Sequence, residues 1–362
     1  MTTLFDPLPL AHGPAMKNRF MLAPLTNWQS HPDGVLSDEE FRWLVKRAEG
    51  GFGLTMTCAA SVSAGGVGFP GQLGVHDDKH IDGLARLAAA INGFGSHSVV
   101  QLHHAGMRSP KDIIGQAPVC PSDNEETGAR ALSLDEVAQV KADFIAAAVR
   151  ADRAGFHGVE LHGAHGYLLC QFLSAEINKR EDAYGGAIEN RARLLFEIID
   201  GVRAECRADF SLGVRLSPER FGLKLDEIKW VAARLLREAK IDYLDMSLWD
   251  VFKPPAEEEH QEKSLLAHFA DLPRGDVRLG AAGKIMTGEA AARALDGGLD
   301  FVVIGRGAIL HHDFPRRVAA DPAFVHTPLP VSADYLRSEA LSEKFVGYMR
   351  TWKGFVEEPE AA

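Results

Sequence analysis

Eight short apolar runs recur along the chain, and a segment with a helical pattern separates each run from the next. The runs are RFMLAP, GLTMTCAA, HSVVQLH, GVELH, FSLGVRL, IDYLDMS, DVRLGAA and LDFVVIG. Most of them do not alternate between apolar and polar residues, as expected of strands that are buried on both faces. Eight strand and helix pairs predict an α/β fold, a single (β/α)8 TIM barrel.

Two serines mark where helices begin. Ser37 and Glu40 stand three residues apart, the spacing of a capping box, and Ser133 and Glu136 repeat it. The first helix is expected to stop at Gly50, because glycine readily ends a helix.

A doubly wound sheet is the rival architecture, since it uses the same units. No GxGxxG follows the first strand, and eight units is the number found in barrels, so the barrel is preferred. We expect one domain over residues 1–362, with the barrel at about 17–320. Long connections at 104–132 and 163–187 leave strand ends where barrel active sites form. The tail, 324–362, is expected to pack on the barrel surface or on a partner subunit.

Composition limits the partners. The 39 Lys and Arg residues against 50 Asp and Glu residues give a net charge of −11, which disfavours nucleic acid and anionic membranes and favours a small-molecule substrate. The four cysteines form no CxxC pair, and neither a signal segment nor a long apolar run is present. A cytoplasmic location is therefore expected.

Polar side chains gather where the predicted strands end. Thr26, Gln101, His162, His165 and Arg215 all stand at or just beyond the carboxyl ends of strands. The carboxyl ends of barrel strands surround one cavity, so we expect these five residues to share it.

His162 and His165, followed by Tyr167, allow two interpretations. The imidazoles could bind a divalent metal, or they could form a metal-free pocket that holds an anionic oxygen. The metal site lacks an evident third carboxylate ligand on the same loop.

The last two strands are followed by glycines and basic residues. Gly283 and Lys284 follow the seventh strand, and Gly305 and Arg306 follow the eighth, where barrels commonly bind phosphate. Arg215 needs a negative partner, either a nearby carboxylate or a ligand that becomes anionic, as a flavin does at N1 when it is reduced.

Six segments together resemble the old yellow enzyme family of FMN-dependent ene-reductases over about residues 17–320. They are KNRFMLAPLT, VVQLHHAG, GVELHGAHGYLLCQFLS, YGGAIENRARLLFEII, GVRLS and VIGRGAIL. The resemblance implies FMN on the barrel axis, with its phosphate at Gly283, Gly305 and Arg306. It places the flavin ring against these residues: Ala23, Pro24, Leu25, Thr26, Ala59, Gln101 and Arg215.

The resemblance also implies roles at the substrate. His162 and His165 match the pair that binds the carbonyl or nitro oxygen of an activated alkene, and Tyr167 matches the proton donor. Trp28 stands in the substrate pocket where a Tyr is common, and Thr26 replaces the Cys of some members. No metal is expected.

We therefore expect an oxidoreductase that takes hydride from NADH or NADPH through FMN and reduces an activated alkene in a ping-pong cycle. The alternatives are a metal-dependent hydrolase or lyase and a non-catalytic flavin- or phosphate-binding barrel. The sequence leaves open the physiological substrate, the preferred coenzyme and the oligomeric state, a homo-oligomer being among the states allowed. It also leaves open whether the tail reaches a neighbouring active site.

Overall fold

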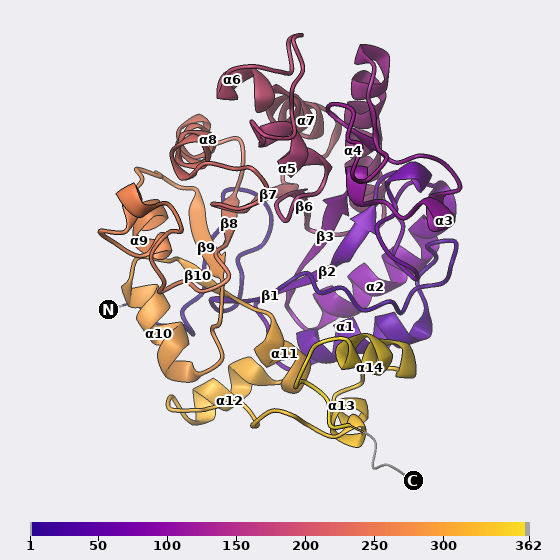
Figure 1. Cartoon of the computed structure of the whole chain (residues 1–362). Helices are drawn as coiled ribbons and strands as arrows, with labels where there is room; N and C mark the ends of the chain where they lie inside the picture. Colours follow the sequence, from indigo (N-terminus) through magenta and orange to yellow (C-terminus); the bar gives the residue numbers. More distant parts are fainter. Residues whose placement is uncertain (1, 359–362) are drawn as a thin grey trace.

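A closed barrel of eight parallel strands forms the centre of the computed structural model, which describes residues 2–358 (Figure 1). Neighbouring strands follow the order β1, β2, β3, β6, β7, β8, β9 and β10, and β10 closes onto β1. The predicted (β/α)8 barrel is confirmed. Its strands are β1 (Phe20–Leu22), β2 (Leu54–Ser61), β3 (His97–His103), β6 (Gly158–Gly163), β7 (Ser211–Leu216), β8 (Tyr243–Ser247), β9 (Arg278–Ala282) and β10 (Phe301–Ile304).

Helices surround the strands. Those of the barrel layer are α1 (Asp38–Glu49), α2 (Ile81–Gly93), α4 (Leu134–Arg153), α7 (Arg193–Glu205), α8 (Leu225–Glu238), α9 (Leu265–Ala270), α10 (Gly288–Asp296), α11 (Arg306–Leu310) and α12 (Phe314–Ala320). Both faces of most strands are buried, which explains their continuous apolar sequence. Among the described residues, no helix is both long and apolar enough to cross a bilayer.

The two predicted capping boxes differ. Ser133 and Glu136 form the complete reciprocal box at the start of α4. At α1 the Ser37 side chain accepts the Glu40 N–H, but the Glu40 carboxyl instead accepts hydrogen bonds from Asn27 and Ser30. The predicted reciprocal hydrogen bond, from the Ser37 backbone N–H to the Glu40 carboxyl, is therefore wrong. Buried Asn27 and Ser30, which follow β1 in the chain, bind that carboxyl instead.

The long connections carry structure of their own. The first holds α3 (Lys111–Ile114) and a small parallel pair, β4 (Val119–Cys120) and β5 (Arg130–Ala131). The second holds α5 (Leu168–Leu173), and α6 (Ile188–Arg191) follows directly after it. Both connections lie beyond the carboxyl ends of β3 and β6, beside the mouth of the barrel.

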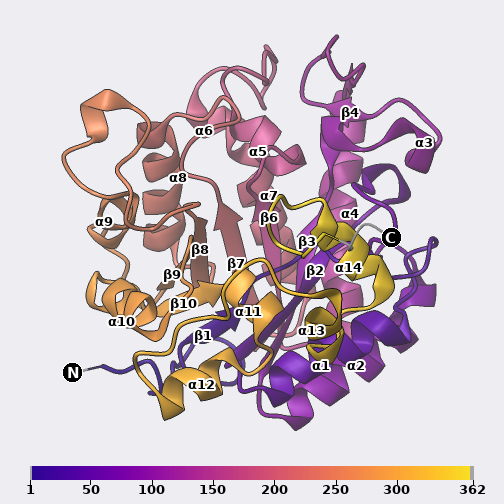
Figure 2. The same ribbon diagram turned by 60° about the horizontal axis from the view of Figure 1, so that its bottom comes forward.

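The tail folds as α13 (Ala333–Ser338) and α14 (Glu343–Arg350) and packs on the chain's own barrel. Figures 1 and 2 both place α13 beside α1. The buried Arg47 of α1 donates hydrogen bonds to the carbonyls of Ala308 in α11 and of Glu339 just after α13. This guanidinium fixes the tail against α1 and α11.

Candidate active site

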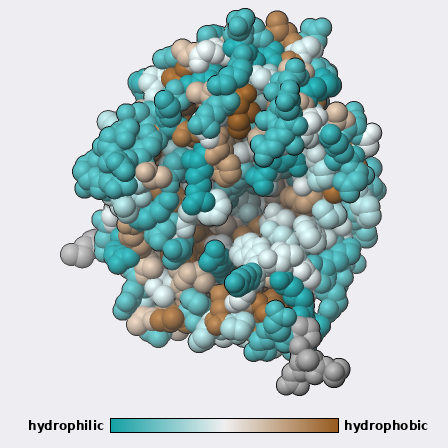
Figure 3. All heavy atoms as spheres, in the orientation of Figure 1, coloured by the Kyte–Doolittle hydropathy of each residue, from teal (hydrophilic) through white to brown (hydrophobic). Residues whose placement is uncertain are grey.

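A pocket of about 440 Å³ opens at the carboxyl ends of the barrel strands. The face in Figure 3 is hollowed near its centre, with a mostly hydrophilic rim. The residues predicted to bind the cofactor all line this pocket, as do the three predicted catalytic residues. They are Ala23, Pro24, Leu25, Thr26, Ala59, Gln101, Arg215, Gly283, Gly305 and Arg306, together with His162, His165 and Tyr167.

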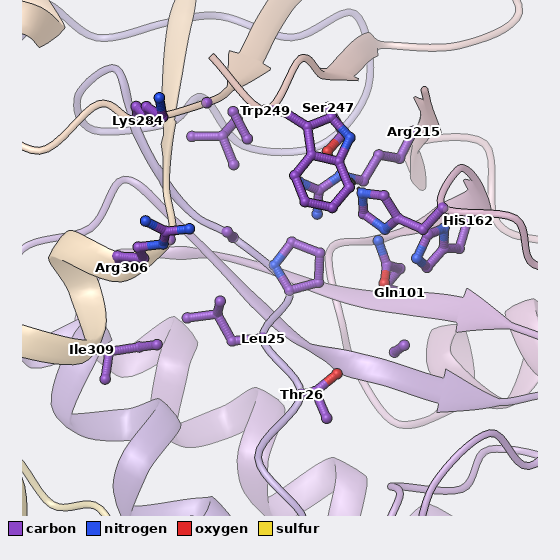
Figure 4. A pocket seen from close by; sticks show the side chains of 18 of the residues that line it. Leu25, Thr26, Gln101, His162, Arg215, Ser247, Trp249, Lys284, Arg306 and Ile309 are labelled. Atoms are coloured by element: carbon purple, nitrogen blue, oxygen red, sulfur yellow. Dashed lines mark hydrogen bonds between the residues drawn. The ribbon is translucent and has the colours of Figure 1, made fainter. Parts of the chain in front are cut away.

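The strand register brings the polar side chains together. His162 of β6 is paired with Arg215 of β7, so the two side chains stand at the same level of the barrel. A register shift in β2 places Ala59 opposite Gln101 of β3, and both residues line the pocket. Figure 4 shows Gln101, His162 and Arg215 on one side of the pocket and Lys284 and Arg306 on the opposite side.

The His162 imidazole is a neutral hydrogen-bond donor. Its Nδ1 accepts the backbone N–H of Ala164 at 3.3 Å, so the ring proton resides on Nε2. Burial, followed by the nearby His165, lowers the pKa of His162 well below its usual value. This donor therefore stays uncharged at neutral pH.

His165 is held by its backbone and its ring. Its N–H donates to the Ser217 hydroxyl at 3.0 Å, its carbonyl accepts from Arg108, and its Nε2 lies 2.7 Å from the Ser247 hydroxyl. Its φ of 59° is left-handed, a conformation that tertiary contacts must hold in a non-glycine residue. Burial lowers the pKa of His165 to about 3.

Tyr167 completes the polar side of the pocket. It is the N-cap residue of α5, and its ring centroid lies 5.1 Å from that of His162. The Arg108 guanidinium lies 4.6 Å from the ring centroid. Burial raises the pKa of Tyr167, and Arg108 partly opposes this, so the phenol keeps its proton at neutral pH and can act as a general acid.

The opposite side has the features of an anion site. Lys284 forms an ion pair with Asp250 at 3.2 Å, whereas Arg306 forms no ion pair with any described residue. A Cβ on Gly283 would lie 2.8 Å from the Asp250 nitrogen, so only glycine fits there. A Cβ on Gly305 would meet nothing closer than 3.8 Å, which leaves room for a ligand beside Leu25.

Arg215 has a carboxylate partner within the protein. Its Nε lies 3.1 Å from Asp245 Oδ2, so the simpler of its two predicted partners is present. Nε nevertheless makes no hydrogen bond with any described residue. Arg215 also lines the pocket, where it remains able to face a ligand.

In the described part of the chain, His162 and His165 are not part of a group of three possible metal ligands. Among the described residues, one group of three His, Cys, Asp or Glu ligand atoms lies close enough together for a metal. It consists of Glu257, Glu259 and His260, none of which lines the pocket.

Sequence reasoning missed several pocket residues. Arg108, Phe221, Ser247 and Trp249 come from loops or strand ends, and the position of Ser247 at the end of β8 was a usable signal. Tyr348 and Trp352 come from the tail, and no spacing in the sequence predicts that they reach the pocket.

The predicted substrate residue Trp28 contacts the pocket residue Tyr348. It does not line the pocket itself, and its ring lies 4.9 Å from that of Tyr348.

The chain is similar in sequence to flavin oxidoreductases. The model of the NADH:flavin oxidoreductase / NADH oxidase family matches residues 3–323. A probable NADH-dependent flavin oxidoreductase of Bacillus subtilis (strain 168), YqiG, is 34% identical over 87% of this chain and 87% of its own. An NADH:fumarate oxidoreductase of Klebsiella pneumoniae (strain 342) is 33% identical over 88% of this chain, which spans 36% of that longer protein.

A solved structure shows the same arrangement. The old yellow enzyme homologue from Zymomonas mobilis superposes with a TM-score of 0.79 at 29% identity, over 96% of this chain and 99% of its own. The fold and the pocket thus define a flavin-dependent barrel oxidoreductase. The chain belongs to the NADH:flavin oxidoreductase / NADH oxidase family, that of the old yellow enzymes. It is an NAD(P)H-dependent enzyme whose cofactor is FMN.

The residues present fit FMN. One wall of the pocket is apolar, with Ala23, Pro24 and Leu25, and suits a flat aromatic ring. The Arg306 guanidinium and the room beside Gly305 suit a phosphate. Arg215 and Gln101, on the far side, suit the polar edge of the ring.

Proposed function

We propose that this enzyme reduces the C=C bond of activated alkenes, namely α,β-unsaturated carbonyl compounds or related acceptors, in a ping-pong cycle with NADH or NADPH. One observation carries the proposal: a neutral imidazole donor, a second imidazole and a protonated phenol line the pocket side by side, with ring centroids 5.0 to 6.5 Å apart. Bound FMN would supply the carrier that takes hydride from the coenzyme and passes it to the acceptor.

The imidazoles hold the acceptor. Hydrogen bonds from His162 and His165 to a carbonyl or nitro oxygen strengthen as negative charge develops there, which lowers the barrier to hydride addition at the β-carbon. Tyr167 then donates a proton to the α-carbon. These roles require side chains that are neutral at working pH, as the lowered pKa of both histidines and the raised pKa of Tyr167 provide.

The proposed cofactor contacts use both ends of the pocket. Gly283, Gly305 and Arg306 would hold the FMN phosphate, while the remaining predicted residues would surround the ring. Trp28 would shape the substrate pocket through Tyr348. The name of the Klebsiella relative supports the substrate class, because fumarate is an activated alkene.

We also propose that the chain is a single FMN-binding domain. We propose a cytoplasmic location as well, because four free cysteines suit a reducing compartment. Its tail would complete the pocket of its own barrel. Contribution to a neighbouring site in a homo-oligomer is the alternative.

A spectrum and a turnover assay test the function. The purified protein should be yellow, release FMN on denaturation, bleach with NAD(P)H and regain its colour with 2-cyclohexenone. Double-reciprocal plots at several enone concentrations should be parallel. A colourless protein whose activity needs a divalent metal would favour the hydrolase or lyase alternative, and a yellow protein that NAD(P)H cannot bleach would favour a binding protein.

A further inference from the structure

Two carboxyl groups lie in the barrel interior just beneath the pocket. Glu160 precedes His162 by two residues on β6, and Asp245 precedes Ser247 by two residues on β8. Residues two apart on a strand share a face, so Glu160 and Asp245 form the layer below the pocket-lining His162 and Ser247. Neither carboxyl residue has any exposed surface.

This layer supports the two polar residues proposed to face the flavin ring. Gln101 Nε2 donates to Glu160 Oε1 at 2.8 Å, and Arg215 Nε lies 3.1 Å from Asp245 Oδ2. The other oxygen of Glu160 and both oxygens of Asp245 make no hydrogen bond with any described residue. Buried carboxylate oxygens are normally paired, so this layer has unused capacity to bind protons.

The charges of the layer do not balance. Glu160 faces Arg215 from β7, Asp245 and Tyr243 from β8, and the uncharged Gln101 from β3. Asp245 faces Arg215, and its register partner on β9 is Gly280. One guanidinium cannot compensate two ionised carboxylates, and an unpaired buried charge costs several kcal/mol.

One carboxyl therefore holds a proton at neutral pH. Burial, followed by the charge of Asp245, raises the pKa of Glu160. Burial also raises the pKa of Asp245, against the effect of Arg215. Asp245 lies 3.1 Å from Arg215 Nε and is therefore its ionised counterion, whereas Glu160, whose hydrogen-bond partner is the uncharged Gln101, is the protonated member.

We propose that Glu160 and Asp245 form a proton-binding carboxyl pair that sets the reduction potential of bound FMN through Arg215, and that the pair takes up one proton when FMN is reduced. Both residues are positioning residues, because they act through Arg215 and Gln101. The inference rests on the proposed placement of the ring against these two side chains.

The step balances in charge and atoms. Hydride transfer brings two electrons and one proton to FMN, releases NAD(P)⁺ and leaves one negative charge on the ring. Arg215 then compensates the ring, and the uncompensated Asp245 carboxylate forms an O–H bond with a proton from solvent. Reoxidation by an acceptor reverses this protonation.

Redox titration of the FMN-loaded protein against reference dyes between pH 6 and 9 tests the proposal. In the parent, the pH dependence of the midpoint potential should correspond to more than one proton per two electrons. In Asp245→Asn it should fall to one proton, because the added proton site is gone. Asp245→Asn should also raise the ratio of reduced to oxidised FMN at a given potential at least tenfold, equivalent to a midpoint shift of about 30 mV for two electrons, since Arg215 loses its counterion.

Two further variants locate the effect. Glu160→Gln keeps an oxygen that accepts from Gln101, and it should change only the alkaline part of the curve, where Glu160 ionises in the parent. Asp152→Asn removes the carboxylate of an Asp–Arg pair with Arg207 outside the pocket, and it should leave the curve unchanged. A parent slope of one proton throughout, or a reduced-to-oxidised ratio in Asp245→Asn within twofold of the parent's at the same potential, overturns the proposal.

The outcome is independent of the proposed reaction. The titration needs FMN but no alkene, so an enzyme without enone reductase activity still gives a result. The parent slope also decides the matter where a variant fails to fold.

Discussion

The imidazoles of His162 and His165 meet edge to face, with ring centroids 5.0 Å apart and planes at 84°. Two neutral imidazoles at this spacing can hold one anionic oxygen between them. Simple phenols should therefore bind as phenolates and give a long-wavelength charge-transfer band with oxidised FMN.

Replacing both His162 and His165 by Ala should abolish that band. Two hydrogen bonds to a charged acceptor contribute about 3 kcal/mol or more together, on the order of 100-fold in affinity. Spectral titration with a phenol measures this directly. The pair His76 and His80, whose rings lie 4.7 Å apart outside the pocket, offers a matched double-Ala control that should retain the band. A band of similar affinity in the pocket variant would mean that its imidazoles are structural.

Tyr167→Phe should affect one half-reaction alone. The substitution keeps the aromatic ring and its contact with Arg108 but removes the phenol hydroxyl that donates the proton. General-acid catalysis worth roughly 10² to 10⁴ in rate is therefore lost. Stopped-flow traces should show near-normal bleaching by NAD(P)H and much slower reoxidation by 2-cyclohexenone.

Oxygen serves as the internal control for that variant, because its reduction does not use the phenol and its rate should change little. If enone reoxidation stays within a few-fold of the parent, the proton comes from another source and Tyr167 is only a wall of the pocket.

Arg306→Ala should weaken FMN binding. Charge-assisted contacts to a phosphate contribute roughly 1.5 to 3 kcal/mol, which corresponds to about 10- to 150-fold in Kd. Fluorescence titration of the apoprotein with FMN measures the change. Arg317→Ala, which breaks a surface pair with Asp313 on α12, should leave the Kd unchanged. Unaltered affinity in Arg306→Ala would place the phosphate elsewhere.

Acid should destabilise the fold through buried neutral histidines. Burial lowers the pKa of His97 to about 3, and its ring nitrogens bond to Pro14 O at 2.9 Å and Ser211 Oγ at 2.7 Å. Between about pH 6.5 and 3 the unfolded chain therefore binds a proton at this site that the folded chain does not, so stability falls as pH falls. From pH 7 to pH 5 this costs about 2 kcal/mol for His97.

Urea unfolding at the two pH values checks this. In His97→Gln the loss of stability on acidification should be smaller than in the parent by about 2 kcal/mol, whatever the variant's absolute stability. His31→Gln, at an exposed position, should keep the parent's pH dependence. An unchanged pH dependence in His97→Gln would show that His97 titrates normally in the folded protein.

Much of the fold and the site could be predicted because both depend on local pattern. Buried strands have a recognisable composition, and a closed barrel brings the ends of its strands to one mouth. The sequence alone therefore predicts that residues as distant as Thr26 and Arg306 line one pocket, as they do. The Glu40 carboxyl shows the limit, because its spacing from Ser37 indicated a capping box while buried Asn27 and Ser30 bind it instead.

The sequence by itself thus indicated the barrel and the strand ends that line the pocket, since both follow from periodicity along single stretches of chain, and its resemblance to old yellow enzymes implied the flavin. Only the tertiary structure decided that Asp245 pairs with Arg215, that Trp28 contacts Tyr348, and that the tail reaches the pocket. These contacts join segments far apart in the chain. Their geometry depends on how helices, strands and loops pack against one another, and the spacing of residues within one segment does not predict that packing.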